Sequence, residues 1–192
     1  FGPLCDVQIT PEETNKLQEN LLITHAVGVG KPIDKQLSKI MMICKVHALC
    51  QGFSGVRLEL IERIVYFIEN DLLPTVPKQG SVGASGDLAP LAHLFLPLIG
   101  EGEFWAGNKI VPAKKVLNER NLKPIKLEAK EGLALTNGTT IMTALGVLET
   151  HRAEIINQTG DTAACLSLEA LNGTQTAYDE RIRGQNAAGS GC

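Results

Sequence analysis

The segment Gly80-Ser81-Val82-Gly83-Ala84-Ser85-Gly86-Asp87-Leu88 is the most informative stretch of this sequence. As a phosphate-binding loop it fails, because the spacing from Gly80 to Gly86 is wrong and no Lys-Ser or Lys-Thr pair follows. A second interpretation is a flexible loop in which Asp87 caps the next helix. An apolar helix is therefore expected to begin near Asp87.

Helical patterns flank this loop on both sides. Upstream, Thr10-Pro11-Glu12-Glu13 has the capping threonine, first-turn proline and third-position glutamate of a capping box. A small hairpin is predicted over residues 103–111, centred on Ala106-Gly107-Asn108. The sequence thus predicts an all-α or nearly all-α fold, a helical bundle with a small β-hairpin insertion. Apolar spacing and breaks at glycine and proline predict helices at 11–29, 34–51, 55–71, from about 87, 139–158 and 162–179.

Composition excludes several classes of function. With 44% hydrophobic and 20% charged residues, the 192-residue chain can bury a core. The net charge of −3 is interspersed, which argues against a nucleic-acid partner. The most apolar stretch, 88–99, contains two prolines and is too short to span a membrane. Five widely spaced cysteines, without a signal-peptide pattern, predict a reducing cytoplasmic location.

The longer segment from Gly80 to His93 closely resembles the signature of the histidine/phenylalanine ammonia-lyases, which are helical proteins. The resemblance runs from the first residue to about Ile182. It predicts that residues 1–182 are a fragment of the lyase domain and that 183–192 form an irregular tail or junction. It is carried further by Phe1-Gly2, 17–22, 24–30, 52–56 and 130–139.

The resemblance implies that Ala84, Ser85 and Gly86 cyclise into the electrophile 4-methylideneimidazol-5-one (MIO). The residue types suit this chemistry, because the amide nitrogen of Gly86 must attack the Ala84 carbonyl across a tight bend that a side chain would obstruct. Ser85 must then lose its hydroxyl group. The implied reaction is elimination of ammonia from L-histidine to give trans-urocanate. The alternatives are a phenylalanine or tyrosine ammonia-lyase, an aminomutase, or a non-catalytic helical scaffold with an uncyclised Ala-Ser-Gly.

Three further residues receive roles from the resemblance. Asn137, otherwise a turn or cap residue, is expected to hydrogen-bond the prosthetic group or the substrate. His25, otherwise a core histidine, is expected to bind substrate, because Thr24-His25 resembles the Ser-His pair of histidine-specific members. Asp87 is expected both to cap a helix and to assist cyclisation.

No metal site is expected. Cys44, His47 and Cys50 are spaced along one helix, which does not wrap a tetrahedral ion, and no second ligand pair completes a site. His93 and His151 are interpreted as structural, and Phe53 receives no catalytic role.

The ends of the chain, Phe1 and the linker-like residues 187–192, suggest an excised piece. The resemblance places a catalytic tyrosine upstream of Phe1 and further site residues in a second half, and it implies a homotetramer.

Overall fold

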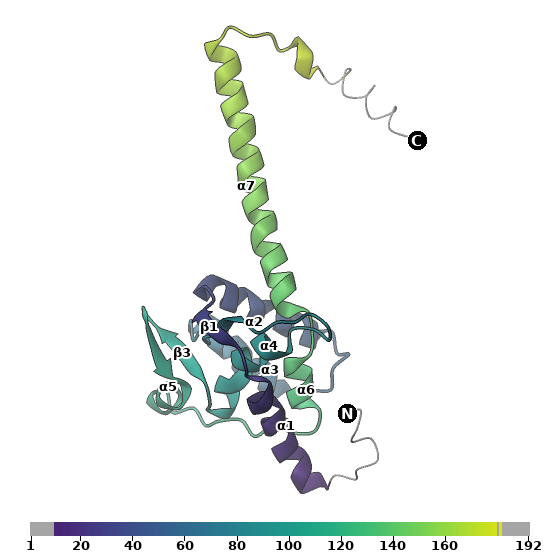
Figure 1. The fold of residues 1–192 in the computed structure, drawn as a ribbon, viewed down its shortest axis with the longest axis vertical. Coiled ribbons are helices and arrows are strands. Elements are labelled where there is room, and N and C mark those ends of the chain that lie inside the picture. The colour runs from purple at the N-terminus through teal and green to yellow at the C-terminus, as the bar shows by residue number, and fades with distance from the viewer. Residues whose placement is uncertain (1–9, 180, 182–192) are drawn as a thin grey trace. The chain divides into compact units, whose positions relative to one another are not determined.

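The computed structural model describes residues 10–179 and 181 (Figure 1). Phe1-Gly2 and the predicted tail at 183–192 therefore lie outside the described residues. The chain divides into two compact units, residues 1–148 and 149–192.

The first unit is mainly helical and confirms the predicted fold class. The predicted hairpin is present: β3 (Glu103–Ala106) pairs with β4 (Lys109–Pro112), with Glu103 opposite Pro112 and Ala106 opposite Lys109. Its helices are α1 (Pro11–His25), α2 (Lys35–Cys50), α3 (Leu58–Glu69), α4 (Leu88–Phe95), α5 (Ala113–Glu119) and α6 (Glu131–Thr136), with a 3-10 turn at Leu96–Ile99. Its strands form two antiparallel pairs, β1 (Val29–Pro32) with β2 (Pro77–Gln79) and β3 (Glu103–Ala106) with β4 (Lys109–Pro112).

The first helix begins as predicted and ends early. Thr10 accepts from the amide of Glu13, whose carboxylate in turn accepts from the Thr10 backbone, which completes the capping box. The helix stops at His25 instead of continuing to 29. Gly30, with φ of +88°, then belongs to β1, which pairs with a strand almost fifty residues later. That long-range pairing, like α5 and α6, was not predicted.

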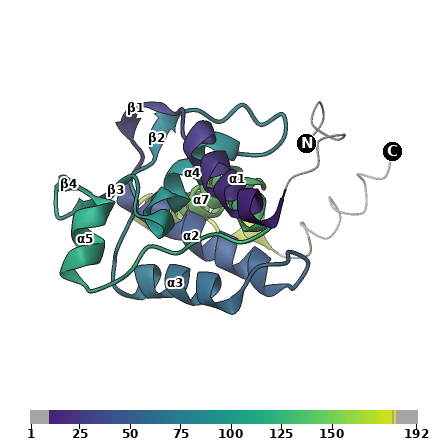
Figure 2. The same cartoon turned by 90° about the horizontal axis from the view of Figure 1, so that it is seen from below.

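Helix α4 lies in the centre of the first unit and is buried along most of its length. It contacts α1 and α6, and Figure 2 shows α2 beside α3, an arrangement that their packing supports. The rings of Phe67 on α3 and Phe104 on β3 meet edge to face, with centroids 5.1 Å apart. The loop at 80–87 therefore leads into the most buried helix of the unit.

One long helix, α7 (Thr140–Ala170), replaces the two helices predicted at 139–158 and 162–179. The predicted break lay between residues 158 and 162, where the chain has Gly160, but a glycine inside a helix costs only about 1 kcal/mol relative to alanine and does not end it. The helix ends where Asn172 adopts a left-handed conformation with φ of +53°. Beyond it, Thr176–Tyr178 form only a 3-10 turn. Within the described residues, no helix is long and apolar enough to span a membrane.

Candidate functional site

The loop before α4 is anchored by the carboxylate of Asp87, which is fully buried. One oxygen accepts from the Ser81 hydroxyl at 2.7 Å, and the other accepts from the amides of Ile141 at 2.9 Å and Met142 at 3.3 Å. Asp87 thus caps α7, whereas the sequence predicted that it would cap the helix that follows it. It occupies the N-cap position of α4, but its side chain makes no capping bond there. The first amides of α7 need acceptors, and the fold brings this carboxylate to them.

The turn at Asn137-Gly138 packs directly against the end of the loop. The Asp87 amide donates to the Gly138 carbonyl at 2.7 Å. Gly86 has φ of +92°, and a Cβ built on it would lie 2.6 Å from the Gly138 oxygen. The structure therefore brings the predicted Ala84-Ser85-Gly86 segment and the turn that carries Asn137 together, across fifty residues of sequence.

The tripeptide fits the prosthetic group that the resemblance implies. Ala84 and Ser85 are exposed, so the β-carbon of Ser85 is accessible to a reactant. A side chain at Gly86 would be strained, because of both its positive φ and the closeness of Gly138. The buried Asp87 fixes the loop at its end. The cyclisation of Ala84, Ser85 and Gly86 itself stays a prediction.

Lys45 is a residue of this site that the sequence analysis missed. Its side chain is buried, and its Nζ donates to the carbonyl of Asn137 at 2.7 Å. Burial lowers the pKa of this ammonium to about 8. A signal for it was present, because Lys45 follows the buried Leu37 and Met41 at intervals of eight and four along α2. A charged residue on an apolar helix face needs a reason for being there.

A pocket of about 830 Å³ lies beside the turn. Asn137 is exposed and lines this pocket, together with Lys45 and the exposed ring of Phe53. The lining contains neither His25 nor residues 84–86, so the pocket collects only part of the predicted site. The other walls are formed by residues of α2 between 43 and 49, by Ser54 and Gly55, and by residues between 130 and 143.

His25 is the last residue of α1, is half-buried and does not line this pocket. Its Nδ1 lies 2.8 Å from the Leu21 carbonyl and 3.4 Å from the Thr24 hydroxyl. Nδ1 therefore carries the proton in the neutral ring and donates to the carbonyl. His93, by contrast, accepts from the Gly28 amide through Nε2 at 3.0 Å, which is a structural role. Burial lowers the pKa of His93, in spite of an opposing effect of Glu103.

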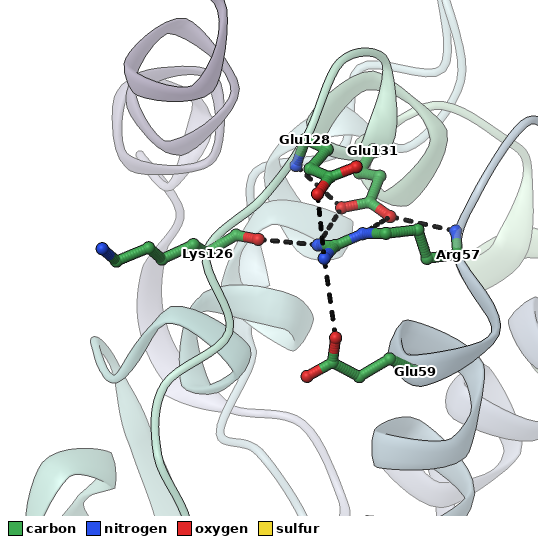
Figure 3. Close-up of polar contacts among 5 residues, drawn as sticks. All are labelled: Arg57, Glu59, Lys126, Glu128 and Glu131. Carbon is green, nitrogen blue, oxygen red and sulfur yellow. Dashed lines mark hydrogen bonds and ion pairs between the residues drawn. The ribbon is translucent and has the colours of Figure 1, made fainter. Parts of the chain in front are cut away.

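An ion pair holds the other end of the helix that leads to Asn137. Figure 3 shows Arg57, before α3, bound to Glu131 at the start of α6. The Arg57 amide, Nε and Nη2 donate to this carboxylate at 3.0, 2.9 and 2.8 Å, and the Glu128 amide donates at 2.8 Å. Burial alone would raise the pKa of Glu131, but these hydrogen bonds lower it below its usual value. Arg57 also pairs with the exposed Glu59 at 3.5 Å.

Within residues 10–179 and 181, no three histidine, cysteine, aspartate or glutamate side chains gather into a group that could hold an ion. Cys44 and His47 instead line the pocket.

The fold and this loop define a class of protein. In the helical unit, the segment that resembles the lyase signature has Ala84 and Ser85 exposed and Gly86 against the Asn137-Gly138 turn, and the buried Asp87 anchors its end. The chain belongs to the aromatic amino acid lyase family, whose model matches residues 1–188.

Individual relatives refine this assignment. The chain is 50% identical, over 95% of its length, to a histidine ammonia-lyase of Chloroflexus aurantiacus, and it spans 35% of that relative. The crystal structure of histidine ammonia-lyase from Trypanosoma cruzi superposes with a TM-score of 0.85 at 38% identity, over 93% of this chain and 35% of that one. The tyrosine aminomutase of Streptomyces globisporus has a TM-score of 0.83 at 35% identity, over 88% of this chain and 32% of that one. The chain thus spans about a third of the length of these relatives.

Proposed function

We propose that this chain is part of an ammonia-lyase that converts L-histidine into trans-urocanate and ammonia. The observation that carries the proposal is the exposed Ala84-Ser85 pair followed by Gly86, which lies against the Gly138 carbonyl. The names of the relatives support histidine as the substrate.

The proposed cofactor is MIO, made from Ala84, Ser85 and Gly86. In its formation the Gly86 nitrogen bonds to the Ala84 carbonyl carbon and one water leaves, and Ser85 then loses its hydroxyl with its α-proton as a second water. When formed, the group supplies an electrophile for the substrate. Asp87 would assist by holding the end of the loop through Ser81 and the first amides of α7.

Binding and orientation would fall to two side chains on different elements. The Asn137 amide can both donate and accept, and it is exposed beside the turn that touches Gly86. His25 would contact the substrate imidazole. Its Nδ1 donates to the Leu21 carbonyl, which leaves Nε2 as the acceptor of the neutral ring for a substrate N–H.

We also propose that the full-length protein is a cytoplasmic homotetramer that takes a free amino acid as substrate and has no nucleic-acid or membrane partner. The proposal about the assembly rests on the resemblance to the family.

The decisive experiment is the intact mass of the chain. We expect the loss of two waters, with the change mapped to residues 84–86 by peptide analysis. Ser85→Ala should not lose both waters, because alanine has no β-leaving group. Ser85→Cys is the matched control, since its thiol can still leave, so its mass should fall by one water and one hydrogen sulfide. Retention of both waters by the unaltered chain would contradict the proposal and favour a non-catalytic scaffold.

Substrate choice is tested in the full-length protein with His25→Leu. This variant should lose roughly tenfold to a hundredfold in turnover of histidine, because a buried polar group left without its hydrogen-bond partner typically costs about 1–3 kcal/mol. Turnover of phenylalanine should fall much less. Equal losses with both amino acids would assign His25 to the packing of α1, and formation of a β-amino acid would indicate an aminomutase.

A further inference from the structure

We propose that Lys45 is a positioning residue for cyclisation: its buried ammonium holds the Asn137 carbonyl and so keeps the Asn137-Gly138 turn pressed against Gly86. The consequence for cyclisation rests on the proposed function. The positioning itself rests on the contacts of Lys45 alone.

The surroundings of Lys45 make it an unusual lysine. It is only 4% exposed, on the face of α2 that packs into the core. Its hydrogen bond is to one neutral carbonyl, that of Asn137, and no carboxylate of the described residues forms an ion pair with it. A buried charge without a counter-ion is costly, and an apolar side chain of similar length would avoid this cost. Core packing alone therefore does not explain a lysine here.

The contact can be followed from Lys45 to the tripeptide in two steps. The Asn137 carbonyl is held by Nζ, and the next carbonyl, that of Gly138, accepts from the Asp87 amide at 2.7 Å. The same Gly138 oxygen is the atom that a Cβ on Gly86 would meet at 2.6 Å. A shift of the turn away from Lys45 would thus release the backbone of both Gly86 and Asp87.

Cyclisation depends on this backbone. The Gly86 nitrogen must approach the Ala84 carbonyl carbon closely, and small errors in the position of a nucleophile slow a reaction strongly. Lys45 touches neither reacting atom, so it acts through the turn. Loss of its hydrogen bond should allow the turn to move and the approach to become less frequent.

The test compares Lys45→Met with Lys39→Met in the 192-residue chain. Lys39 lies on the same helix but pairs with Asp71 at the surface, so the chemical change is matched. Intact mass at successive times after induction measures the fraction that has lost two waters. We expect Lys45→Met to cyclise about tenfold more slowly, the effect of one hydrogen bond to a charged group. Lys39→Met should match the unaltered chain, and Lys45→Arg, which keeps a charged donor, should recover part of the rate.

A second measurement separates positioning from stability. Hydrogen exchange of the Asp87 amide should become faster in Lys45→Met and stay unchanged in Lys39→Met, while the urea midpoint of Lys45→Met does not fall. Equal cyclisation in both methionine variants, or unchanged exchange at Asp87, would overturn the proposal. If the unaltered chain retains both waters, the proposed function fails, and exchange at Asp87 alone then decides whether Lys45 positions the turn. If Lys45→Met does not fold, Lys45→Gln, whose side chain is shorter and uncharged, is compared with Lys39→Gln, and equal exchange at Asp87 in these two variants would overturn the proposal.

Discussion

At the scale of single residues, Gly86 has little room for a side chain because it lies against Gly138. A Cβ at position 86 would lie 2.6 Å from the Gly138 oxygen, whereas a Cβ at Gly83 would meet nothing within 4 Å. Both glycines have positive φ, +92° and +70°, so the two positions share a backbone that disfavours side chains. They differ mainly in the space around them.

This difference leads to a prediction about Gly86→Ala, with Gly83→Ala as its control. Gly86→Ala should lower the free energy of unfolding by about 1–3 kcal/mol more than Gly83→Ala, because overpacking must push the Asn137-Gly138 turn away. It should also block the loss of two waters. Urea denaturation and intact mass check both effects, and similar stabilities for the two variants would show that the turn yields easily.

Lys45 should make stability depend on pH in the alkaline range. Burial lowers its pKa from 10.5 to about 8 in the folded chain, so the unfolded chain binds the proton more tightly. Between these two pH values the unfolded state holds more protons, and the free energy of unfolding should therefore rise with pH, by at most about 3 kcal/mol. Urea titrations at pH 8 and pH 10 measure the rise. It should persist in Lys39→Met and disappear in Lys45→Met.

At the scale of secondary-structure elements, the ion pair between Arg57 and Glu131 ties the start of α3 to the start of α6. Helix α6 has only six residues and ends at Thr136, next to Asn137. Because so short a helix is not stable by itself, its position depends on such tertiary contacts. The pair is therefore a distant support of the candidate site.

We predict that Glu131→Gln lowers the free energy of unfolding by about 2–3 kcal/mol at pH 7, since it removes a buried charge that accepts several hydrogen bonds. Glu59→Gln removes an exposed partner of the same arginine and should change stability by less than about 1 kcal/mol. The pKa of Glu131 is depressed, so its stabilisation is present above the ordinary value of 4.5 and is lost as pH falls below it. Equal effects of the two variants at pH 7, measured in urea, would contradict this account.

At the scale of the whole molecule, the chain spans about a third of its relatives. We expect the 192-residue chain alone to show no measurable ammonia-lyase activity, even with its electrophile formed. The resemblance places a tyrosine base and a carboxylate clamp outside it. A positioned base typically contributes about a hundredfold to ten-thousandfold, and orientation about 7–11 kcal/mol. Urocanate formation from L-histidine by this chain alone would contradict this expectation.

The second unit should also affect how the chain behaves in solution. Its α7 residues Ile156 and Leu166 are 69% and 64% exposed, and Leu171 beyond the helix is 81% exposed. Exposed apolar side chains along one segment favour association. Light scattering should therefore report a mass above that of one chain, and a monomer at micromolar concentration would argue against this role for the apolar residues.

Much of the local structure could be predicted because local interactions determine it. The capping box at Thr10 and Glu13 and the hairpin around Gly107 involve residues close in sequence, and both were found where their patterns indicated. The break predicted between residues 158 and 162 was wrong, because the weak helix propensity of the one glycine there, Gly160, does not outweigh a long helical stretch. The pairing of β1 with β2 was missed because two strands so short and so far apart carry little signal of their own.

The sequence by itself determined the family, the Ala84-Ser85-Gly86 segment and the helical class, since a long specific motif and helical periodicity can be recognised without coordinates. Only the tertiary structure decided what holds that segment. In the folded chain the Asp87 carboxylate accepts from the first amides of α7 instead of capping the helix that follows it. The fold also places Lys45 against the turn that packs on Gly86. The physical reason is that buried charges and close backbone contacts obtain their partners from distant elements, and only packing determines which elements meet.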